Sequence, residues 1–375
     1  MMLKRQLTQV IWDNLVQSKK AIVLIGPRQT GKTTLLKDLI ASDKDYLFLD
    51  GDDPLVRNEL TEINTIQLRQ LIGDNQIVFV DEAQRIPGIG LTLKLITDQL
   101  PDIQLFVSGS SAFEINQQVN EPLTGRKWEY NLFPISWKEL ENELGYLKSK
   151  QQLEQRLIYG MYPEVVTNLG NEERILKQLT SSYLYKDVLS IAGVRKPESI
   201  EKLLKALAFQ MGNEVSYNEL SNLVGIDKNT ISTYIDILEK TFVIFKLQPF
   251  SRNLRNEIST KRKIYFFDNG LRNMLISNFS SLGYRNDKGQ LWENFLISER
   301  HKQNHYQDRV VNTYYWRTKQ QQEVDFVEES NGRLKAFEFK YSDKKKAKLP
   351  ITFDKAYPET SFEVVSSENF HGFVT

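Results

Sequence analysis

Two glycines, a lysine and a threonine near the start of the chain have the spacing of a phosphate-binding loop. The stretch from Gly26 to Thr33 reads G-x-x-x-x-G-K-T, between the continuous apolar run 21–25 and a segment with apolar residues at helical spacing. The glycines let the backbone turn its N–H groups toward an anion, and the N-terminus of the following helix adds partial positive charge. Lys32 is expected to reach the β- and γ-phosphates of ATP, and the Thr33 hydroxyl to bind Mg²⁺.

A second apolar run, 77–80, ends in two carboxylates, Asp81 and Glu82. Strands buried on both faces of a parallel sheet have such unbroken runs, and ligands bind at their carboxyl ends. Asp81 is expected to hold Mg²⁺, and Glu82 to polarise the attacking water. An acidic pair also often begins a solvated loop, so its place downstream of the phosphate loop is what favours catalysis. The expected nucleotide-binding residues are Gly26, Pro27, Arg28, Gln29, Thr30, Gly31, Lys32, Thr33, Thr34 and Asp81.

Ser108 and Arg126 are further candidates for the same reaction. Ser108 ends a third apolar run, where it either orients water or contacts the γ-phosphate, or else belongs to a polar turn. Arg126 either neutralises charge on the transferred phosphoryl group, in cis or from a neighbouring subunit, or is a surface residue. A trans-acting Arg126 requires a homo-oligomer.

The stretches GPRQTGKTTLL, VFVDEAQRI, SGSSAF and LTGRKWEYNLFPISWKEL, in this order and at these spacings, resemble AAA-type ATPases of bacteria and archaea. More narrowly, the chain is similar to the branch whose C-terminal half is a domain of unknown function. The resemblance implies an AAA+ nucleotide-binding core, with Lys32, Thr33, Asp81 and Glu82 at the nucleotide-handling positions. It says little about the biological substrate.

Charged side chains also gather in two predicted strands near the end of the sequence. Period-two alternation puts Glu323, Asp325 and Val327 on one face of the first strand, opposite Val324 and Phe326. In the second strand, Glu338 and Lys340 share one face while the phenylalanines at 337 and 339 lie on the other. We therefore expect an aspartate, a glutamate and a lysine to converge on one side of the strand pair.

That convergence is the arrangement of a metal-dependent phosphodiesterase. Asp325 and Glu338 would bind Mg²⁺, and Lys340 would position or deprotonate the attacking water. The D, then E-x-K pattern resembles the restriction-endonuclease-like fold, in which Glu293 on the preceding helix falls where a further carboxylate is often added. The alternative is an amphipathic hairpin with its charges on a solvated face, and such folds also persist without activity.

The middle of the chain predicts a winged helix-turn-helix: a helix from about 216, a turn at Gly225, a helix from about 228 and the strand FVIFKL. In DNA-binding examples the start of the second helix meets base edges, which here means Lys228, Asn229, Thr230 and Ser232. Such modules also serve as intramolecular clamps or protein docking sites. Two basic clusters either contact phosphates or are merely solvated. They are Arg252, Arg255, Lys261, Arg262 and Lys263, and Lys344, Lys345 and Lys346.

Composition limits the remaining alternatives. The formal charge of +1 provides no global basic field, so nucleic-acid binding requires a local patch. The absence of cysteine excludes disulfides, thiolate nucleophiles and cysteine zinc sites, and the three histidines are expected on the solvated surface. No apolar run approaches the ~20 residues of a membrane span. The first residues have helical spacing rather than a signal-peptide core, so we expect a cytoplasmic protein with no membrane partner.

Together these patterns predict an α/β protein with four segments. They are an AAA+ P-loop parallel-sheet ATPase core at 1–145, a helical lid or linker at 146–208, a winged helix-turn-helix at 209–260 and a restriction-endonuclease-like α/β domain at 261–375. In the lid, Tyr183, Leu184, Val188 and Leu189 are expected to pack as core. The leading hypothesis is a Mg²⁺-dependent ATPase that acts on DNA or RNA, with a C-terminal domain that binds or cuts it. The alternative is a nucleotide-controlled protein-interaction switch with an inert C-terminal domain.

Overall fold

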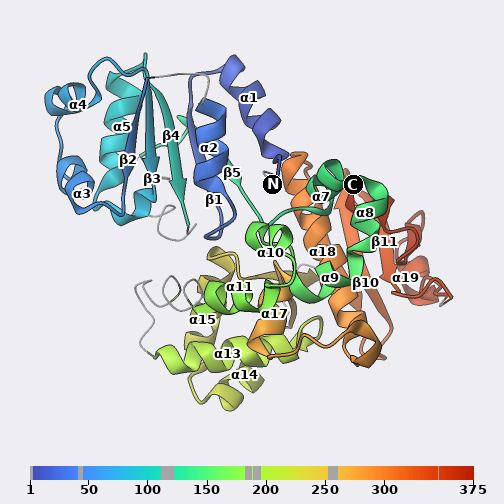
Figure 1. The fold of residues 1–375 in the computed structure, drawn as a ribbon. Coiled ribbons are helices and arrows are strands. Elements are labelled where there is room, and N and C mark those ends of the chain that lie inside the picture. Colours follow the sequence, from blue (N-terminus) through green and yellow to red (C-terminus); the bar gives the residue numbers. More distant parts are fainter. Residues whose placement is uncertain are drawn as a thin grey trace. The chain divides into compact units, whose positions relative to one another are not determined.

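The computed structural model describes residues 3–40, 45–110, 122–181, 188, 196–251, 261–344 and 346–375. The chain divides into two compact units (Figure 1). The amino-terminal unit comprises residues 2–134 with 240–242, and the carboxy-terminal unit comprises residues 135–239 with 243–375. The four segments expected from the sequence are thus distributed over two units, each of which is described by itself.

A five-stranded sheet of order β2-β3-β4-β1-β5, with every pairing parallel, forms the amino-terminal unit. Its strands are β1 (Ala21–Ile25), β2 (Tyr46–Asp50), β3 (Ile77–Asp81), β4 (Gln104–Gly109) and β5 (Lys127–Asn131). The described helical elements of this unit are α1 (Leu7–Gln17), α2 (Lys32–Ile40), α3 (Pro54–Leu60), α4 (Thr65–Ile72), η1 (Ala83–Arg85) and α5 (Ile89–Gln99). Every residue of β1 and β3 is buried, which explains their unbroken apolar runs. The parallel sheet predicted for the core is confirmed.

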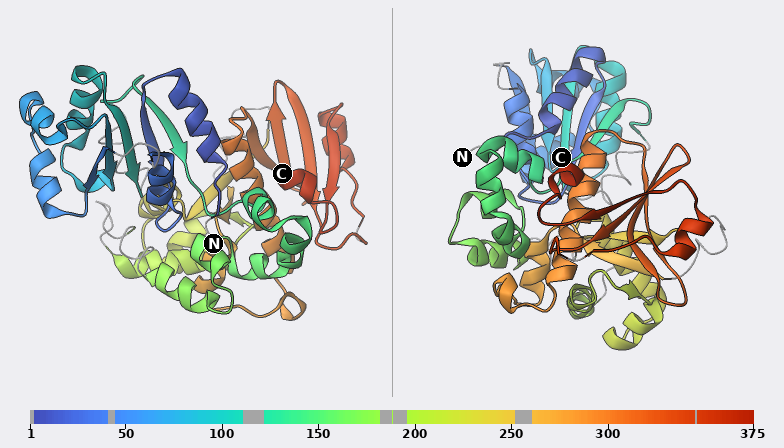
Figure 2. Two further views of the ribbon diagram at one scale, coloured as in Figure 1. Left: turned by 45° about the horizontal axis from the view of Figure 1, so that its top comes forward. Right: turned by 90° about the vertical axis from the view of Figure 1, so that its right-hand side faces the viewer.

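The described part of the carboxy-terminal unit contains a seven-stranded sheet of order β12-β11-β10-β9-β7-β8-β6. The strands are β6 (Glu214–Val215), β7 (Ile244–Pro249), β8 (Arg262–Phe266), β9 (Asn312–Arg317), β10 (Glu323–Ser330), β11 (Arg333–Phe339) and β12 (Ser361–Val365). The helical elements are α7 (Trp137–Leu144), α8 (Tyr146–Gln151), α9 (Leu153–Tyr159), α10 (Pro163–Thr167), α11 (Glu172–Leu179), α13 (Pro197–Phe209), α14 (Tyr217–Val224), α15 (Lys228–Lys240), α17 (Asn269–Leu275), η3 (Leu282–Tyr284), α18 (Lys288–Tyr306), α19 (Ile351–Ala356) and α20 (His371–Val374). Figure 2 shows the last strands side by side in orange to red.

The elements from α13 to β8 follow the order helix, short strand, two helices and two strands. β8 pairs antiparallel with both β6 and β7, and α14 is followed by Gly225, whose φ of +77° favours glycine. α15 buries Ile231, Tyr234, Ile235 and Leu238 along one side. β7 also pairs in parallel with β9, so these strands continue directly into the C-terminal part of the sheet.

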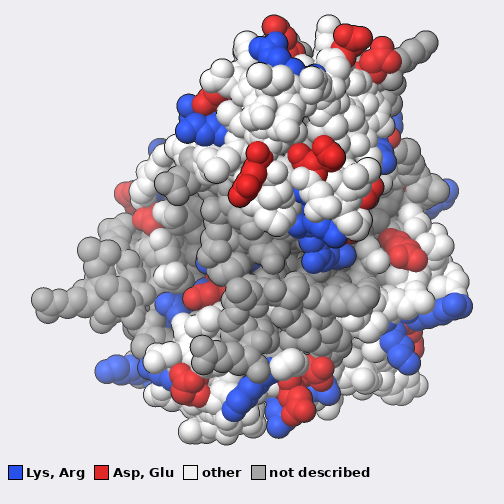
Figure 3. Space-filling view, turned by 90° about the vertical axis from the view of Figure 1, so that its left-hand side faces the viewer, with Lys and Arg blue, Asp and Glu red and all other residues white. Residues whose placement is uncertain are grey.

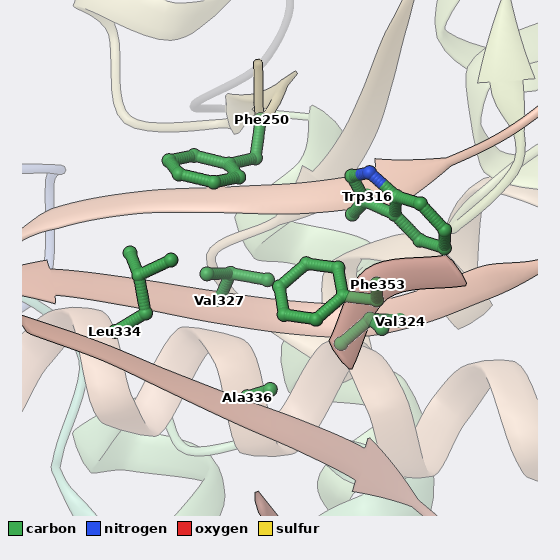
Figure 4. Close-up of a cluster of buried hydrophobic side chains, with 7 residues drawn as sticks. All are labelled: Phe250, Trp316, Val324, Val327, Leu334, Ala336 and Phe353. Carbon is green, nitrogen blue, oxygen red and sulfur yellow. The ribbon is translucent and has the colours of Figure 1, made fainter. Parts of the chain in front are cut away.

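The alternation expected along 323–327 is wrong because β10 contains a register shift. Val324 and Val327 both lie in one hydrophobic cluster with Trp316 and Phe353 (Figure 4), and the pairing of β10 with β9 shifts between those two valines. Phe326 instead contacts the rings of Phe337, Phe339 and Phe373. A bulge inserts one extra residue into a strand, and two-residue periodicity does not anticipate it.

One carboxylate in the carboxy-terminal unit binds two buried arginines. Asp287 accepts hydrogen bonds from Arg285 Nε and Nη2 at 2.8 Å each and from Arg272 Nη1. Burial alone would raise the pKa of Asp287, but the two guanidinium groups outweigh it and lower that pKa to about 2. The bridge therefore joins α17, which carries Arg272, to the start of α18.

His301 does not lie on the solvated surface as expected. Its ring stacks on Phe245 with centroids 5.3 Å apart and meets the edge of Phe267 at 5.4 Å. Burial lowers the pKa of His301 to about 4, so the imidazole is neutral at pH 7. Of the expected lid core, Val188 is buried. Tyr183, Leu184 and Leu189 lie outside the described residues, as do the basic residues Arg252, Arg255 and Lys345.

The searched helices include none that is both long and apolar enough to cross a bilayer, within the part of the chain that the structure describes. On the face drawn in Figure 3, basic and acidic side chains are interspersed over the described residues, as the formal charge of +1 suggests.

Candidate functional site

The phosphate loop connects the end of β1 to the start of α2. Gly31 has a φ of +91°, and Gln29 also lies in the left-handed region at +59°. A Cβ on Gly26 would lie 2.1 Å from the backbone oxygen of Leu132, so only glycine fits there. Pro27 and Thr30 are buried, Arg28 is half-buried, and Gln29 and Thr34 are exposed. The predicted loop residues are therefore consecutive along one turn at the carboxyl end of the sheet.

Lys32 lies over this loop and is only 5% exposed. Its Nζ donates to the backbone oxygens of Gly26 at 2.9 Å and Pro27 at 3.0 Å. The Thr30 hydroxyl donates to the Pro27 oxygen at 2.8 Å. The ammonium group thus already lies where an incoming phosphate would replace the loop carbonyls as its partner.

Asp81, at the end of β3, receives a hydroxyl on each carboxylate oxygen. Thr33 Oγ1 donates to Oδ2 at 2.8 Å, and Ser108 Oγ, from the adjacent strand β4, donates to Oδ1. Asp81 is 7% exposed and Ser108 is fully buried. A hydroxyl and a carboxylate in direct contact beside a phosphate loop are a donor set that suits Mg²⁺, because this ion prefers oxygen ligands. Ser108 therefore contacts the carboxylate rather than forming a solvated turn.

Glu82 has a left-handed backbone, with φ 46° and ψ 44°. Non-glycine residues adopt this conformation only when their surroundings enforce it, and such strain concentrates at functional sites. Here the Glu82 N–H donates to Ser108 Oγ at 3.3 Å. The Glu82 carboxylate accepts from Gln84 Nε2 at 2.5 Å, and the same amide donates to Ser110 Oγ at 2.9 Å. Gln84 therefore orients the Glu82 carboxylate, a contact that the sequence analysis missed although the residue follows the acidic pair in DEAQR.

Arg126 lies at the amino-terminal end of the strands, whereas the phosphate loop lies at their carboxyl end. The backbone oxygen of Arg126 accepts from Ala21, the first residue of β1, whereas the loop follows the last residue of that strand. Five strand residues span about 16 Å. The Arg126 guanidinium pairs with Asp98 and also donates to the Thr124 oxygen. A role in cis is therefore wrong for this residue, and only the trans role stays a prediction.

The carboxylates near the C-terminus do come close to one another. Asp325 Oδ2 accepts from the Phe339 N–H at 2.8 Å, and Lys340 Nζ pairs with Glu338 Oε1 at 2.6 Å. Burial is the first cause that raises the pKa of Asp325 above its ordinary value, and the charges of Glu293 and Glu338 add to it. Mutual repulsion of this kind is what a bound cation would relieve.

Lys263 belongs to this carboxylate cluster rather than to an exposed basic patch, which corrects the sequence-based expectation. It is 2% exposed, and its Nζ lies 2.5 Å from Glu323 Oε1 and 3.2 Å from Glu293 Oε1. Tyr265 donates its hydroxyl to the same Glu293 oxygen at 2.5 Å. Burial alone would lower the pKa of Lys263, but the two carboxylates outweigh it and raise that pKa. Lys263 is therefore an internal counter-ion that cannot grip an external phosphate.

Within the described ranges, no three His, Asp or Glu side chains are arranged to hold a metal ion. Each predicted ligand has a protein donor of its own: the Phe339 N–H on Asp325, Lys340 on Glu338, and Lys263 with Tyr265 on Glu293. The metal site at Asp325, Glu338 and Glu293 stays a prediction.

At the start of α15, the predicted base-reading residues are only partly available. Lys228 and Asn229 are exposed, while Ser232 and Thr230 are half-buried. Asp227 caps the helix, because its carboxylate accepts from the Asn229 N–H at 2.9 Å and from the Thr230 N–H and hydroxyl. A carboxylate at this end of the helix repels phosphates, so it opposes the expected contact with nucleic acid.

Two of the remaining basic candidates have partners as well, and two are exposed. Lys261 pairs with Glu214 at 3.4 Å, and Arg262 Nη1 donates to the Tyr217 hydroxyl at 3.1 Å. Lys344 and Lys346 are exposed.

Comparison with known sequences shows matches to three family models. Residues 18–141 match a model described as AAA domain, and residues 150–282 and 288–372 match models described as domains of unknown function, DUF8612 and DUF4143. An uncharacterized protein of Mycobacterium tuberculosis is 27% identical over 326 residues, which cover 85% of this chain and 70% of the relative. Another, of Methanocaldococcus jannaschii, is 24% identical over 359 residues and covers 85% and 78%.

Among solved structures, the Walker-type ATPase of Pyrococcus abyssi covers 73% of this chain and 96% of its own, with a TM-score of 0.50 and 16% identity. At that identity the likeness shows the fold alone. Together, the AAA-domain match and this fold support an AAA-type ATPase with a parallel-sheet phosphate-loop core, as the sequence predicted.

Proposed function

We propose that this chain is a Mg²⁺-dependent AAA+ ATPase that binds ATP at the loop 26–33 and hydrolyses it. The observation that carries the proposal is the direct contact of Thr33 and Ser108 with Asp81, directly beside Lys32. Mg²⁺ would be held by Thr33 and Asp81, where it would neutralise phosphate charge. Lys32 would bind the phosphates, and Glu82, held by Gln84, would orient the attacking water.

Nucleotide binding can be tested apart from hydrolysis. A fluorescent ATP analogue should bind the wild type with Mg²⁺ and should bind Lys32→Ala far more weakly, because the loop loses its buried cation. Asp81→Asn should still bind nucleotide but should lose the hydrolysis that Mg²⁺ supports. Equal binding by the wild type and Lys32→Ala would contradict this assignment of the nucleotide site.

We further propose that elements α13 to β8 form a winged helix and that the C-terminal sheet carries a nuclease-like site acting on DNA or RNA. The strand order β7-β8-β6 supports the first part, and the proximity of Asp325, Glu338 and Lys340 supports the second. ATPase rates measured with and without DNA or RNA, together with strand cleavage in Mg²⁺ or Mn²⁺, test this proposal. Cleavage should disappear in Asp325→Ala, and the absence of binding, stimulation and cleavage would refute the nucleic-acid role.

A nucleotide-controlled protein-interaction switch is the second candidate. Two observations favour it: Asp227 places a carboxylate at the exposed start of α15, and Lys263 already neutralises two carboxylates of the C-terminal cluster. Under this alternative, ATP hydrolysis persists without any response to nucleic acid. The same set of assays therefore separates the two candidates.

A further inference from the structure

Arg5, which precedes α1, reaches the phosphate loop of the amino-terminal unit. Its Nη1 donates to the backbone oxygen of Thr30 at 2.6 Å, and its Nη2 donates to the backbone oxygen of Phe133 at 2.7 Å. The same Nη1 lies 4.0 Å from the place where a Cβ on Gly31 would be. A residue 25 positions before Thr30 thus joins the loop to the chain that follows β5.

The contact with Phe133 gives Arg5 a fixed support. Leu132 donates its N–H to Ile25, the last residue of β1, at 2.7 Å, and its oxygen faces Gly26 closely enough to exclude any side chain there. The start of the loop is therefore held by backbone packing against residue 132. The end of the loop, at Thr30, is held by the guanidinium that residue 133 anchors.

The contact with Thr30 has an electronic consequence for phosphate binding. The Thr30 carbonyl and the Gly31 N–H belong to one peptide group. A cationic donor on that carbonyl polarises the peptide, which makes the Gly31 N–H a stronger donor. In a phosphate loop it is these backbone N–H groups that cradle the anion.

Arg5 and Lys32 also differ in what nucleotide binding demands of them. Lys32 donates to the Gly26 and Pro27 carbonyls and must leave them to reach a phosphate. Arg5 holds Thr30 from the outer side of the peptide, so its contacts are compatible with an occupied loop. One cation moves to the ligand while the other keeps the loop in its binding shape.

We propose that Arg5 is a positioning residue of the nucleotide site, which fixes the end of the phosphate loop and strengthens its affinity for the phosphates of ATP and ADP. This inference rests on the proposed ATPase function. Arg5 acts through the Thr30–Gly31 peptide and touches neither the substrate nor the attacking water. Its loss should therefore weaken nucleotide binding much more than it lowers kcat.

The experiment measures the Kd of ATP, ADP and adenosine for the wild type, Arg5→Ala, Arg5→Lys and the control Arg69→Ala. Arg69 is an exposed arginine of the same unit that donates to the backbone oxygen of Gln99 at 3.4 Å, away from the loop. For Arg5→Ala the Kd of ATP and ADP should rise about tenfold, the equivalent of about 1.4 kcal/mol. Adenosine, which lacks phosphates, should bind as it does to the wild type.

Two further readouts separate positioning from simple structural damage. Arg5→Lys should fall between the wild type and Arg5→Ala, because one ammonium cannot replace a planar fork that spans two carbonyls. Added guanidinium ion, well below denaturing concentrations, should restore part of the ATP affinity of Arg5→Ala and leave Arg69→Ala unchanged. If Arg5→Ala is poorly folded without nucleotide, these two readouts still distinguish a positioning role of Arg5 from structural damage.

The inference is overturned if Arg5→Ala binds ATP as tightly as Arg69→Ala, or if adenosine and ATP lose affinity equally. Failure of guanidinium to restore any affinity also counts against it. A wild type that neither binds nor hydrolyses ATP contradicts the proposed function as well. A wild type that does both, beside an unaltered Arg5→Ala, contradicts this inference alone.

Discussion

Replacing Lys263 by methionine should strongly destabilise the carboxy-terminal unit. The ammonium group is buried between Glu293 and Glu323, at 3.2 and 2.5 Å, and methionine keeps the length of the side chain while removing its charge. Removing one partner of a buried ion pair leaves uncompensated charge and costs about 3–5 kcal/mol. In a unit of this size that loss should lower Tm by about 6–20 °C.

The pH dependence of this effect follows from the direction of the pKa shift. The folded-state pKa of Lys263 lies above its unfolded value, so its contribution is complete below the unfolded pKa of about 10.4 and is lost only as pH rises through the folded pKa. The stability difference between the wild type and the variant should therefore persist on the alkaline side up to about pH 10. It should narrow at lower pH, where the unpaired carboxylates of the variant take up protons.

Thermal and urea unfolding followed by circular dichroism measure the difference. Lys261→Met is the matched control on the same segment, because the Lys261 side chain is 62% exposed and its pair with Glu214 spans 3.4 Å. An exposed pair of this kind contributes about 0–1 kcal/mol. Adding Glu323→Gln to Lys263→Met should recover part of the loss by removing one unpaired charge. Equal effects of the two lysine substitutions would refute the assignment of Lys263 as a buried counter-ion.

Three other substitutions probe separate parts of the account. Asp287→Asn should lower the free energy of unfolding by about 1–2 kcal/mol at pH 7, after allowance for partial exposure. Because the folded pKa of about 2 lies below the unfolded one, the difference from the wild type in urea unfolding should shrink as the pH falls from about 4 to 2. Gly26→Ala should abolish nucleotide binding, since its Cβ would lie 2.1 Å from the Leu132 oxygen, whereas Gly289→Ala, with open space around it, should not. Ser108→Ala removes a charge-assisted hydrogen bond of about 1.5–3 kcal/mol and should lower kcat about ten- to hundredfold, while binding without Mg²⁺ is unchanged. Unaltered turnover in Ser108→Ala would contradict its assigned place beside the metal.

The amino-terminal fold was predictable because local patterns determine it. Unbroken apolar runs end at the loop starting with Gly26, at Asp81 and at Ser108, and a parallel sheet brings such ends to one edge. What the sequence could not provide was contact between distant residues. Arg5 and Gln84 carry no motif spacing, and the hydrogen bonds from which we propose their roles form only in the folded chain.

In the C-terminal part, the sequence predicted that the carboxylates lie close together, but it did not predict how the strands and the lysine around them pack. Alternation brought Asp325 and Glu338 near each other, but it missed the register shift between Val324 and Val327. Charge counting placed Lys263 in a surface patch, because a sequence does not show which lysine of a basic stretch becomes buried against carboxylates. Both errors come from long-range pairing that one strand alone does not encode.

The central claim is that Lys32, Asp81 and Glu82 form an ATP-hydrolysing site, and single-turnover hydrolysis by the wild type and Glu82→Gln tests it most directly. Glutamine keeps the shape of the side chain but loses the charge that polarises water. The variant should bind ATP with Mg²⁺ as tightly as the wild type and hydrolyse it at least about a hundredfold more slowly, within the range typical of general base catalysis. Unchanged hydrolysis in Glu82→Gln, or hydrolysis that survives in Lys32→Ala, would contradict the claim.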